Sequence, residues 1–574
     1  MVKWQKVLMI VLACAGISFV FCIPIFLKLS AEGIWDWPEA AATYESFRNS
    51  VLHYDQFLFW NPYLCGGAPG LANPQTYFLS IAGLMALFTN SIIGPKIAVF
   101  ISILIGGLGM VKLGRLLKIG YPAVFLSVPL FFTSGFLATH IALGQFLWLT
   151  IMWVPWIFWG YIKSFQNIRY IFVSVFALAL IGIAGRSYLL AYVGISLLLY
   201  ALILDIASHG KKRALIRVVF IGIGAFLIGA FKLIPDLFFF QEKLGALEET
   251  FQLPISYVLD MFLSRPIDPT KTSADHIAGG DFAYYIGVIP IILAGSAFFH
   301  RSLRRVFAPL LFVGIVFFAI GVSTAGTNPL EYLPFIKELR NQHRGFIMVL
   351  FALSLLAAAG LSKVTDYIPS VVSKRSKQII QIAIIVFVIA DLFITSYPIL
   401  LQGFPYTPDT SREGIPFIDA SFVQSRGNNP YRTVKQNRGA GDFCPAILYA
   451  WQNVDSVTII QDTDHYRGEA YVQGAGQVEI TKFSPNELHI KADIENGDIL
   501  VNYKYHNGWT SSVGEVTQAD NGLLAIKVPP GEYSIVLRYI APGFSIGLGI
   551  TLATLVGIAV FLNNKQQKGG DRNP

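Results

Sequence analysis

The sequence predicts a polytopic α-helical membrane protein with a small β-rich domain outside the membrane near its C-terminus. Of its 574 residues, 54% are hydrophobic and only 14% are charged, whereas soluble domains carry roughly 25% charged residues. Apolar runs of about 20 residues, long enough to cross a bilayer, recur along the chain. One segment near the C-terminus instead alternates polar and apolar residues, as half-buried strands do.

Twelve apolar runs are candidates for membrane-spanning helices. The first run, 7–27, resembles a signal peptide at its start, but it continues well past Cys14 to Leu27, and we interpret it as an uncleaved span. The others cover about 94–111, 121–138, 146–162, 170–185, 188–205, 215–237, 282–299, 306–323, 345–362, 378–398 and 543–562.

The basic residues predict the orientation of these spans. With twelve spans, every basic cluster falls on one side of the membrane, which the positive-inside rule makes the cytoplasmic side. This holds only if Tyr77–Phe88 is an interfacial or half-crossing helix on the outer side. We therefore expect a multi-pass plasma-membrane protein with both termini in the cytoplasm. The formal charge of +8 then reflects topology, and we expect no nucleic-acid partner.

The topology divides the chain into three parts. Residues 1–398 form a transmembrane domain with long outer loops at 28–93 and 240–281. Residues 399–541 form an outer domain, and 542–574 hold the last span and a basic tail. Within the outer domain, Glu487–Ile494 and Glu532–Tyr539 alternate polar and apolar residues between turn sequences. We expect a small antiparallel β-sandwich from about 477 to 539.

The first outer loop holds a helix and a rigid ribbon. Pro38 suits a first helical turn, and apolar residues follow at helical spacing, so Pro38–His53 is expected to be an amphipathic helix against the membrane face. The stretch WNPYLCGGAPGLANPQT, 60–76, cannot be helical, because its prolines lack amide donors and its glycines favour turns. Cys65 of this ribbon can in principle pair with Cys444, but nothing in the cysteine spacing indicates a disulfide framework, and we do not expect one.

Several ionisable residues fall at the outer ends of spans. They are Arg186, Lys232, Asp236 and Asp391, with Arg340, His343 and Arg344 just before the tenth span. Each one alone could reach water or pair within the bundle. All of these residues fall on the outer side of the membrane, and this common location is informative. A transporter needs polar sites near the midplane, whereas a reaction centre at the outer interface would place its ionisable residues on the outer side.

The order of these segments resembles the YfhO-like bacterial membrane proteins, which belong to the GT-C class of polytopic glycosyltransferases that use polyprenyl-phosphate sugars. The resemblance rests on an outer-loop Asp between aromatics (GIWDW), the WNP-Y-GG-P-ANPQ ribbon, GDFAYYIGVIPIILA, LPFIKELRNQHRGF and YHNGWTSSV. The chain has Gly144-Gln145 where the family often has Gly-His, and Asn507 where it has Pro. The resemblance implies a GT-C-like fold and a catalytic base at Asp36.

The chemistry of such a transfer suggests further roles. A carboxylate must take the proton of the acceptor hydroxyl, and cationic groups must hold the departing phosphate. Asp36 beside two indoles could have a raised pKa and act as the base; alternatively it caps the helix, with Glu39 completing a capping box. For the phosphate we expect Arg344 and His343 first, then Arg340, with Arg186 a weaker candidate; binding of anionic lipid headgroups is the alternative.

The ribbon offers the groups that grip a sugar. We expect the sugar or acceptor to contact Trp60, Asn61, Tyr63, Asn73 and Gln75, together with Asp281 and Tyr285. The alternative is a structural connection that returns the chain to the membrane. No spacing indicates a structural metal, although Asp36 with Glu39 or Asp281 could bind a divalent cation.

The leading hypothesis is a membrane glycosyltransferase that moves a sugar from a polyprenyl-phosphate donor to a cell-envelope glycan or lipid on the outer face. Its expected partners are that donor, the acceptor and membrane lipid. A lipid-linked sugar translocase is the second hypothesis, although no inverted repeat is evident. An inactive scaffold that binds envelope partners through the β-domain is the third.

Overall fold

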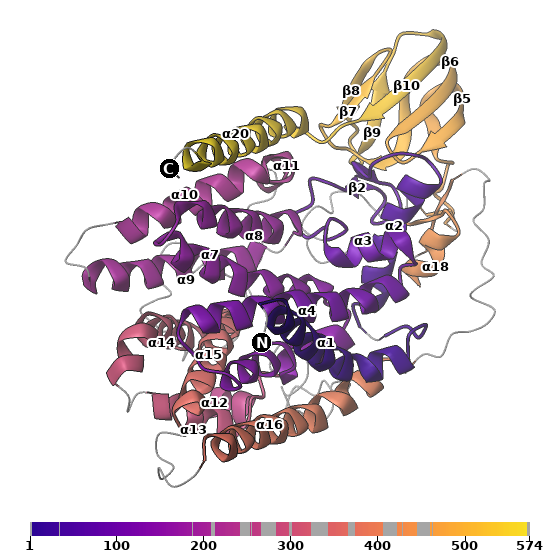
Figure 1. Ribbon diagram of the computed structural model, residues 1–574. Helices are drawn as coiled ribbons and strands as arrows, with labels where there is room; N and C mark the ends of the chain where they lie inside the picture. Colours follow the sequence, from indigo (N-terminus) through magenta and orange to yellow (C-terminus); the bar gives the residue numbers. More distant parts are fainter. Residues whose placement is uncertain are drawn as a thin grey trace.

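The computed structural model describes most of the chain (Figure 1). The described residues are 3–33, 35–185, 187–207, 213–241, 253, 255–265, 283–297, 301–322, 342–364, 373–405, 422–426, 429–444, 460–461 and 463–570. The predicted site residues Arg186, Asp281 and Arg340 lie outside them.

The bulk of the protein is a helical bundle with spans of membrane-crossing length. Among the described residues, seven helical segments are long and apolar enough to cross a bilayer. They are Trp4–Leu27, Ile93–Leu116, Ala123–Ala142, Tyr188–Ala207, Gln342–Val364, Lys374–Gln402 and Phe544–Asn563. Helices α10 (Arg213–Ile228) and α11 (Ala230–Gln241) make an eighth if this pair, bent by 85°, is one span. The chain is therefore a helical membrane protein.

The predicted count of twelve spans is not confirmed. Four of the predicted apolar runs hold shorter or interrupted helices in the structure. They contain η2 (Phe146–Trp153) with α7 (Val154–Ser164), α8 (Ile171–Ile183), α13 (Val288–Ser296), and the apolar part of α14 (Arg301–Gly321), which is Val306–Gly321. Apolar composition alone does not measure helix length, because a buried short helix and a span look alike in sequence.

The segment at 123–142, although one of the seven spans, is also interrupted. It comprises η1 (Ala123–Leu126), α5 (Ser127–Phe132) and α6 (Gly135–Ala142). The helix breaks between Phe132 and Gly135, where the Thr133 hydroxyl donates to the carbonyl of Pro129 at 2.9 Å. The break gives α6 its own start and places the end of α6 beside the first outer loop.

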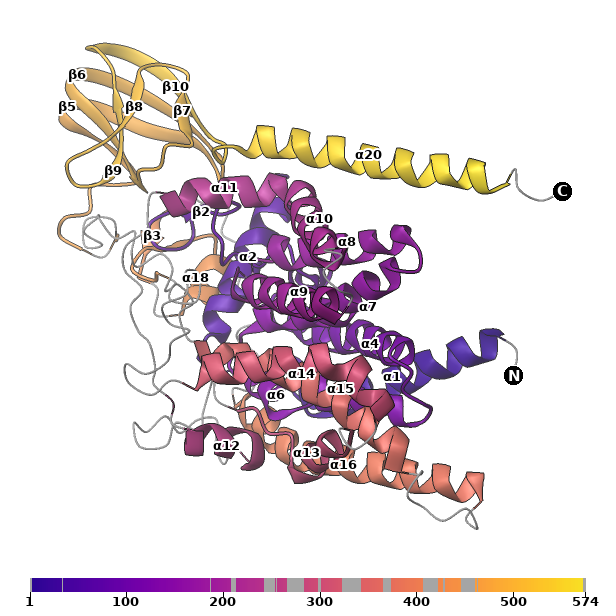
Figure 2. The ribbon, with the colours of Figure 1, turned by 90° about the vertical axis from the view of Figure 1, so that its left-hand side faces the viewer.

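Helices cluster around a continuous apolar core. The core helices include α1 (Lys3–Leu27), α4 (Ile93–Leu116), α9 (Ser187–Ala207), α15 (Phe346–Val364) and α16 (Lys374–Gln402). Helix α12 (Ile255–Leu263) packs at the edge of this core, whereas α20 (Phe544–Gly570) lies along α10 and α11 with much of its surface exposed (Figures 1 and 2). The first residues of α1 and the last of α20 lie at the same end of the bundle, and the β-sheet lies at the opposite end (Figure 2).

The helix predicted in the first outer loop is confirmed as α2 (Trp37–Leu52), but its surroundings differ from the expectation. We expected one face to lie against the membrane. Instead, eleven of its sixteen residues are buried, including Glu45 and Asn49. The reason is that protein covers it: α3 (Ile81–Phe88) packs on it, and the Asn49 amide donates to the carbonyl of Val434 in α18 (Pro430–Lys435) at 2.7 Å.

The C-terminal domain is a single six-stranded antiparallel sheet. Its strands are β5 (Ala470–Ser484), β6 (Glu487–Lys504), β7 (Trp509–Ser511), β8 (Glu515–Gln518), β9 (Leu523–Lys527) and β10 (Gly531–Tyr539). The order is β7-β10-β6-β9-β8, with β5 pairing along β6. The predicted alternation is confirmed, with Leu488, Ile490, Ile535 and Leu537 buried. The expected pair of sheets is replaced by one, because β6 is long enough to pair with β10 through its first half and β9 through its second.

Candidate functional site

Asp36 lies at the junction between the first outer loop and α6. Its backbone N–H donates to the carbonyl of Leu143 at 3.1 Å, and the Trp37 indole donates to the carbonyl of Ile141 at 3.0 Å. These bonds use carbonyls at the end of α6, which a helix terminus leaves without intrahelical partners. Gly144 has φ +81°, and a Cβ there would lie 2.5 Å from the backbone nitrogen of Trp37. The Gly144 backbone can therefore approach α2 closely because it carries no side chain.

The Asp36 side chain makes no capping hydrogen bond to α2. Its Oδ2 instead accepts a hydrogen bond from Nε2 of Gln145 at 2.9 Å, and Oε1 of Gln145 lies 2.6 Å from Nδ1 of His140. A carboxylate only accepts, so Gln145 must turn its NH₂ group toward Asp36 and its oxygen toward His140, whose Nδ1 then carries the proton. His140 is fully buried, while Asp36 is exposed. A buried imidazole and an amide thus orient an accessible carboxylate.

Desolvation acts on the neighbouring carboxyl group. We expected Asp36 to be partly desolvated, but the structure exposes it and leaves Glu39, one helical turn along α2, half-buried. Burial, together with the negative charge of Asp36, raises the pKa of Glu39 to about 8. The two carboxyl groups therefore sit in different environments, which is how a pair of acids acquires different protonation states near neutral pH.

Glu39 lines a small recess with the predicted amide residues of the ribbon. Asn61, Asn73 and Gln75 contribute to this recess, together with Tyr77. Oδ1 of Asn61 accepts the backbone N–H of Tyr63 at 3.1 Å, and Oδ1 of Asn73 accepts that of Gln75 at 2.9 Å. The recess has a volume of about 30 Å³, roughly the space that one water molecule occupies. It admits a hydroxyl group, and a whole sugar ring would have to lie across its mouth.

The two aromatic residues predicted to contact the sugar lie elsewhere. Trp60 is fully buried against the β-sheet, with its ring 4.9 Å from Tyr539 and 5.4 Å from Trp509. Tyr63 is also buried, and its hydroxyl donates to Oδ1 of Asn437 at 3.0 Å. The small strands β1 (Trp60–Asn61) and β2 (Ala68–Pro69) pair beside them. These aromatic rings attach the ribbon to the outer domain, which corresponds to the structural alternative for this part of the ribbon.

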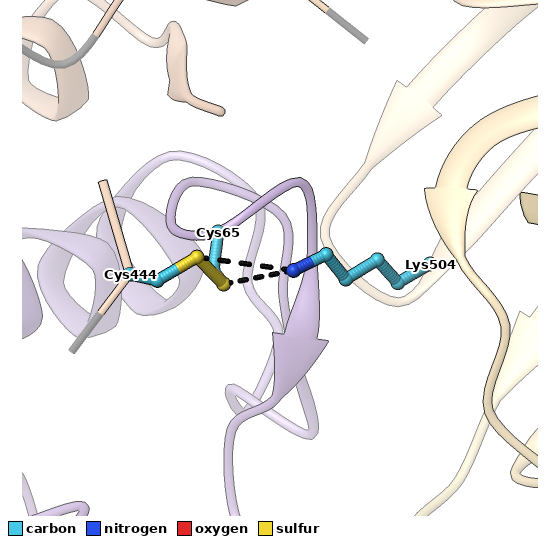
Figure 3. Close-up of a disulfide and its surroundings, with 3 residues drawn as sticks. All are labelled: Cys65, Cys444 and Lys504. Atoms are coloured by element: carbon cyan, nitrogen blue, oxygen red, sulfur yellow. Dashed lines mark hydrogen bonds between the residues drawn. A yellow bond between two sulfur atoms is a disulfide. The ribbon is translucent and has the colours of Figure 1, made fainter. Parts of the chain in front are cut away.

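A disulfide fastens the ribbon to the same domain. Cys65 and Cys444 are bonded across 379 residues, contrary to our expectation. The ammonium group of Lys504, in β6, lies 3.0 Å from Sγ of Cys65 and 3.8 Å from Sγ of Cys444 (Figure 3). Cysteine spacing could not reveal this bond, because the two residues meet only through the tertiary fold. Strands β3 (Gln424–Ser425) and β4 (Gly439–Ala440) hold the segment that precedes Cys444.

The far end of the ribbon is fastened to α11. Nζ of Lys232 donates to the carbonyls of Leu71 and Asn73 at 2.6 and 2.7 Å and pairs with Asp236 at 2.6 Å. Lys232 and Asp236 are both buried. These two ionisable residues hold the backbone that carries Asn73, so they position the recess.

The predicted phosphate-binding residues lie at the start of α15. His343 and Arg344 belong to the short helix η6 (Gln342–Gly345). His343 is buried, and its carbonyl accepts the hydroxyl of Tyr284 at 3.2 Å. The Arg344 guanidinium lies 5.7 Å from the ring centre of Tyr188. Arg344, partly exposed, is therefore the better placed of the two to meet an anion.

Tyr285 belongs to a polar cluster on the other side of α6. Its hydroxyl donates to Oδ2 of Asp391 at 2.8 Å, and Arg265 pairs with the same carboxylate. Its carbonyl accepts the N–H of Gly135, the first residue of α6, at 3.4 Å. The structure thus places Tyr285 beside the helix that carries His140, but it does not bring Tyr285 into the recess at Glu39.

An apolar cavity begins one residue from Gln145. It has a volume of about 290 Å³ and lies between α3, η2 and α8. Its lining includes Phe78, Ile81, Phe146, Met152, Trp153 and Leu180. Phe146 also packs edge-on against Trp37, with ring centres 4.7 Å apart. Sequence reasoning missed both this cavity and Gln145; the one available signal for Gln145 was its place in the Gly144-Gln145 pair.

Two carboxyl groups at the site raise the question of a metal. Within the described ranges, no group of three or more His, Cys, Asp or Glu side chains is arranged to hold a metal ion. Asp36 and Glu39 alone offer fewer ligands than a protein-bound divalent cation usually has.

No family model and no curated protein sequence matches the chain. Several solved structures match the chain at low similarity. The arabinofuranosyltransferase AftD from Mycobacteria is 16% identical with a TM-score of 0.44, over 69% of this chain and 27% of that one. ArnT from Cupriavidus metallidurans, bound to undecaprenyl phosphate, is 11% identical with a TM-score of 0.46, over 86% of this chain and 99% of that one. At these values, a function for this chain must rest on its own residues.

Proposed function

We propose that the protein is an integral membrane glycosyltransferase with a GT-C-like fold. It transfers a sugar from a polyprenyl-phosphate donor to a cell-envelope glycan or lipid acceptor at the outer face of the membrane. The observation that carries this proposal is the position of Asp36. Asp36 is an accessible carboxylate that Gln145 orients. It lies three residues before Glu39, which lines the polar recess, and Gln145 precedes Phe146, which lines an apolar cavity suited to a lipid chain.

The reaction is a displacement at the anomeric carbon of the donor. Asp36 takes the proton of the acceptor hydroxyl while the hydroxyl oxygen forms its bond to the anomeric carbon. The bond from that carbon to the phosphate oxygen breaks, and its electron pair leaves with the polyprenyl phosphate. Glu39, protonated near neutral pH, can donate a hydrogen bond to a sugar hydroxyl. Arg344, with Arg186 and Arg340 as further candidates, would balance the charge of the departing phosphate.

Three features support an outer-face location. The predicted topology puts the basic clusters in the cytoplasm. The Cys65–Cys444 disulfide joins two segments predicted to lie outside, where disulfides form and persist. The start of α1 and the end of α20 lie at one end of the bundle, opposite the β-sheet (Figure 2), as two cytoplasmic termini require.

The assay that tests this function uses purified protein in liposomes. The substrates are a radiolabelled polyprenyl-phosphate sugar and an envelope glycan fraction. The proposal expects release of polyprenyl phosphate together with label in the glycan. Movement of intact labelled donor across the bilayer without its cleavage would instead identify a translocase. If the protein showed neither transfer nor movement of the donor, the scaffold hypothesis would remain.

A further inference from the structure

A second cavity lies in the outer domain, apart from the Asp36 site. It has a volume of about 570 Å³, within the range of small-molecule binding sites. Its walls come from four parts of the chain: Tyr54 of the first outer loop, the segment around Phe422, the segment around Glu469, and the β5–β6 hairpin with Lys482. Neither the sequence analysis nor the proposed reaction uses these residues.

The polar part of the cavity is built around Glu469. Its Oε1 accepts the backbone N–H of Gln424 and the hydroxyl of Tyr466, each at 2.7 Å, and its Oε2 accepts the amide of Asn502 at 3.2 Å. Burial raises the pKa of Glu469 to about 7, although these three donors oppose the shift. A carboxylate offers about four acceptor positions, so Oε2 retains the capacity to accept from a ligand.

The apolar part of the cavity is a fixed aromatic wall. Phe422 and Phe483 stack with ring centres 4.2 Å apart and an interplanar angle of 6°. Tyr54 meets Phe483 edge-on at 5.7 Å, and its hydroxyl accepts the amide of Asn437 at 2.7 Å. Rings held in this way lose little freedom when a ligand packs against them.

We propose that this cavity binds a sugar unit of a glycan chain. A sugar has an apolar C–H face for the aromatic wall and hydroxyl groups that can donate to Glu469, Tyr466 and Thr481 and accept from Lys482, all of which line the cavity. The cavity is lined by one carboxyl group, one ammonium group and neutral hydroxyls, and this mixture fits a neutral sugar better than a polyanion.

The position of the cavity connects it to the acceptor. Tyr54 follows the end of α2, whereas Asp36 precedes its start. The sixteen residues of α2 span about 24 Å at ~1.5 Å per residue. A glycan that reached both places would contain several sugar units. This inference rests on the proposed function. It implies that the acceptor is an extended glycan and that the outer domain binds the end of the glycan farthest from Asp36.

Binding to the full-length protein in detergent tests the inference without requiring transfer. The probes are fluorescent oligomers of hexose, N-acetylhexosamine and pentofuranose, each two to six units long. We expect saturable binding of at least one series, tightening with length. Thr481→Trp places a bulky side chain at an exposed rim position and should weaken binding about 10-fold or more, as should Glu469→Gln, which removes a charged acceptor.

Glu532→Gln, at an exposed position of β10 outside the cavity, is the matched control and should bind like the parent. Because Thr481→Trp alters an exposed strand residue, its loss of binding is not attributable to loss of the fold, and a thermal melt checks this. Absence of saturable binding by all probes, or equal binding by Thr481→Trp and the parent, overturns the inference. Because the binding assay contains no donor and requires no transfer, failure of the transfer reaction and failure of this site are separable.

Discussion

Nε2 of Gln145 donates a hydrogen bond to Oδ2 of Asp36 at 2.9 Å, joining residues that are 109 positions apart. The opposite end of the same amide contacts the buried imidazole of His140. Gln145 is therefore a positioning residue. It fixes the rotamer of the Asp36 carboxylate, which we propose as the base, and does not itself contact the reacting atoms.

This relationship predicts a pH effect that a merely structural residue would not cause. Gln145→Glu places a second carboxyl group against Asp36, and repulsion between the two charges should move the acidic limb of the pH–rate profile to higher pH. Gln145→Leu removes the hydrogen bond and should lower turnover about 10-fold or more without such a shift. Pre-steady-state or initial-rate profiles from pH 4 to 9 measure both effects. An unmoved acidic limb in Gln145→Glu would argue against Asp36 as the titrating base.

Glu39 should make the protein less stable as pH rises. Its folded-state pKa of about 8 exceeds the ordinary value of 4.5. Its protonated form therefore contributes stability fully below about pH 4.5, and that contribution is lost as pH rises through about 8. Glu39→Gln cannot ionise, so its melting temperature should fall less than that of the parent between pH 5 and 8. Glu469, with a pKa of about 7, makes the melting temperature fall with pH in the same way in Glu39→Gln and in the parent. If the melting temperatures of Glu39→Gln and the parent fell equally between pH 5 and 8, Glu39 would be ionised in the folded protein, contrary to this prediction.

The disulfide predicts a definite count of reactive thiols. Cys14 and Cys22 are free, and Cys65 and Cys444 are bonded. Denatured, unreduced protein should therefore take up two maleimide labels, and reduced protein four. Cys65→Ser with Cys444→Ser should lower the stability of the ribbon, by roughly 2–5 kcal/mol if this bond resembles those of small secreted domains. Cys14→Ala is the control. Four labels without reduction would contradict the bonded pair.

The predicted orientation can be checked by labelling from outside the cell. Single cysteines at the exposed positions Glu495 and Glu515 of the sheet should react with an impermeant maleimide, whereas one at Arg213 should react only after permeabilisation. Each variant is made in a background without the native cysteines. The reverse pattern would place the β-domain in the cytoplasm and remove the basis for outer-face chemistry.

Sequence patterns predicted the local elements well. The helix expected at Pro38–His53 is Trp37–Leu52, and the alternating segments of the outer domain are strands β6 and β10. Both signals are short-range, because helical and strand periodicity can be read within a single segment. The role of β6 in pairing with β5, β9 and β10 has no such signal, so one sheet was mistaken for two.

The site was predictable only in part for the same reason. Asn61, Asn73 and Gln75 share a recess with Glu39, but Trp60 and Tyr63 of the same ribbon face the outer domain. Turn residues fix a ribbon locally, whereas the partners of its side chains depend on segments hundreds of residues away. The Cys65–Cys444 bond and the Asp36–Gln145 hydrogen bond are both of this long-range kind.

The most direct test of the account is donor turnover by Asp36→Asn. Asn preserves the shape of Asp36 and can still accept a hydrogen bond from Gln145, but it cannot take a proton from the acceptor. We expect turnover to fall by ~10²–10⁴-fold, the usual contribution of a general base, with the melting temperature unchanged. Glu39→Gln, which keeps a neutral hydrogen-bond donor at its position, should retain most of the activity. Turnover by Asp36→Asn near the parent rate would contradict the central claim that Asp36 is the catalytic base.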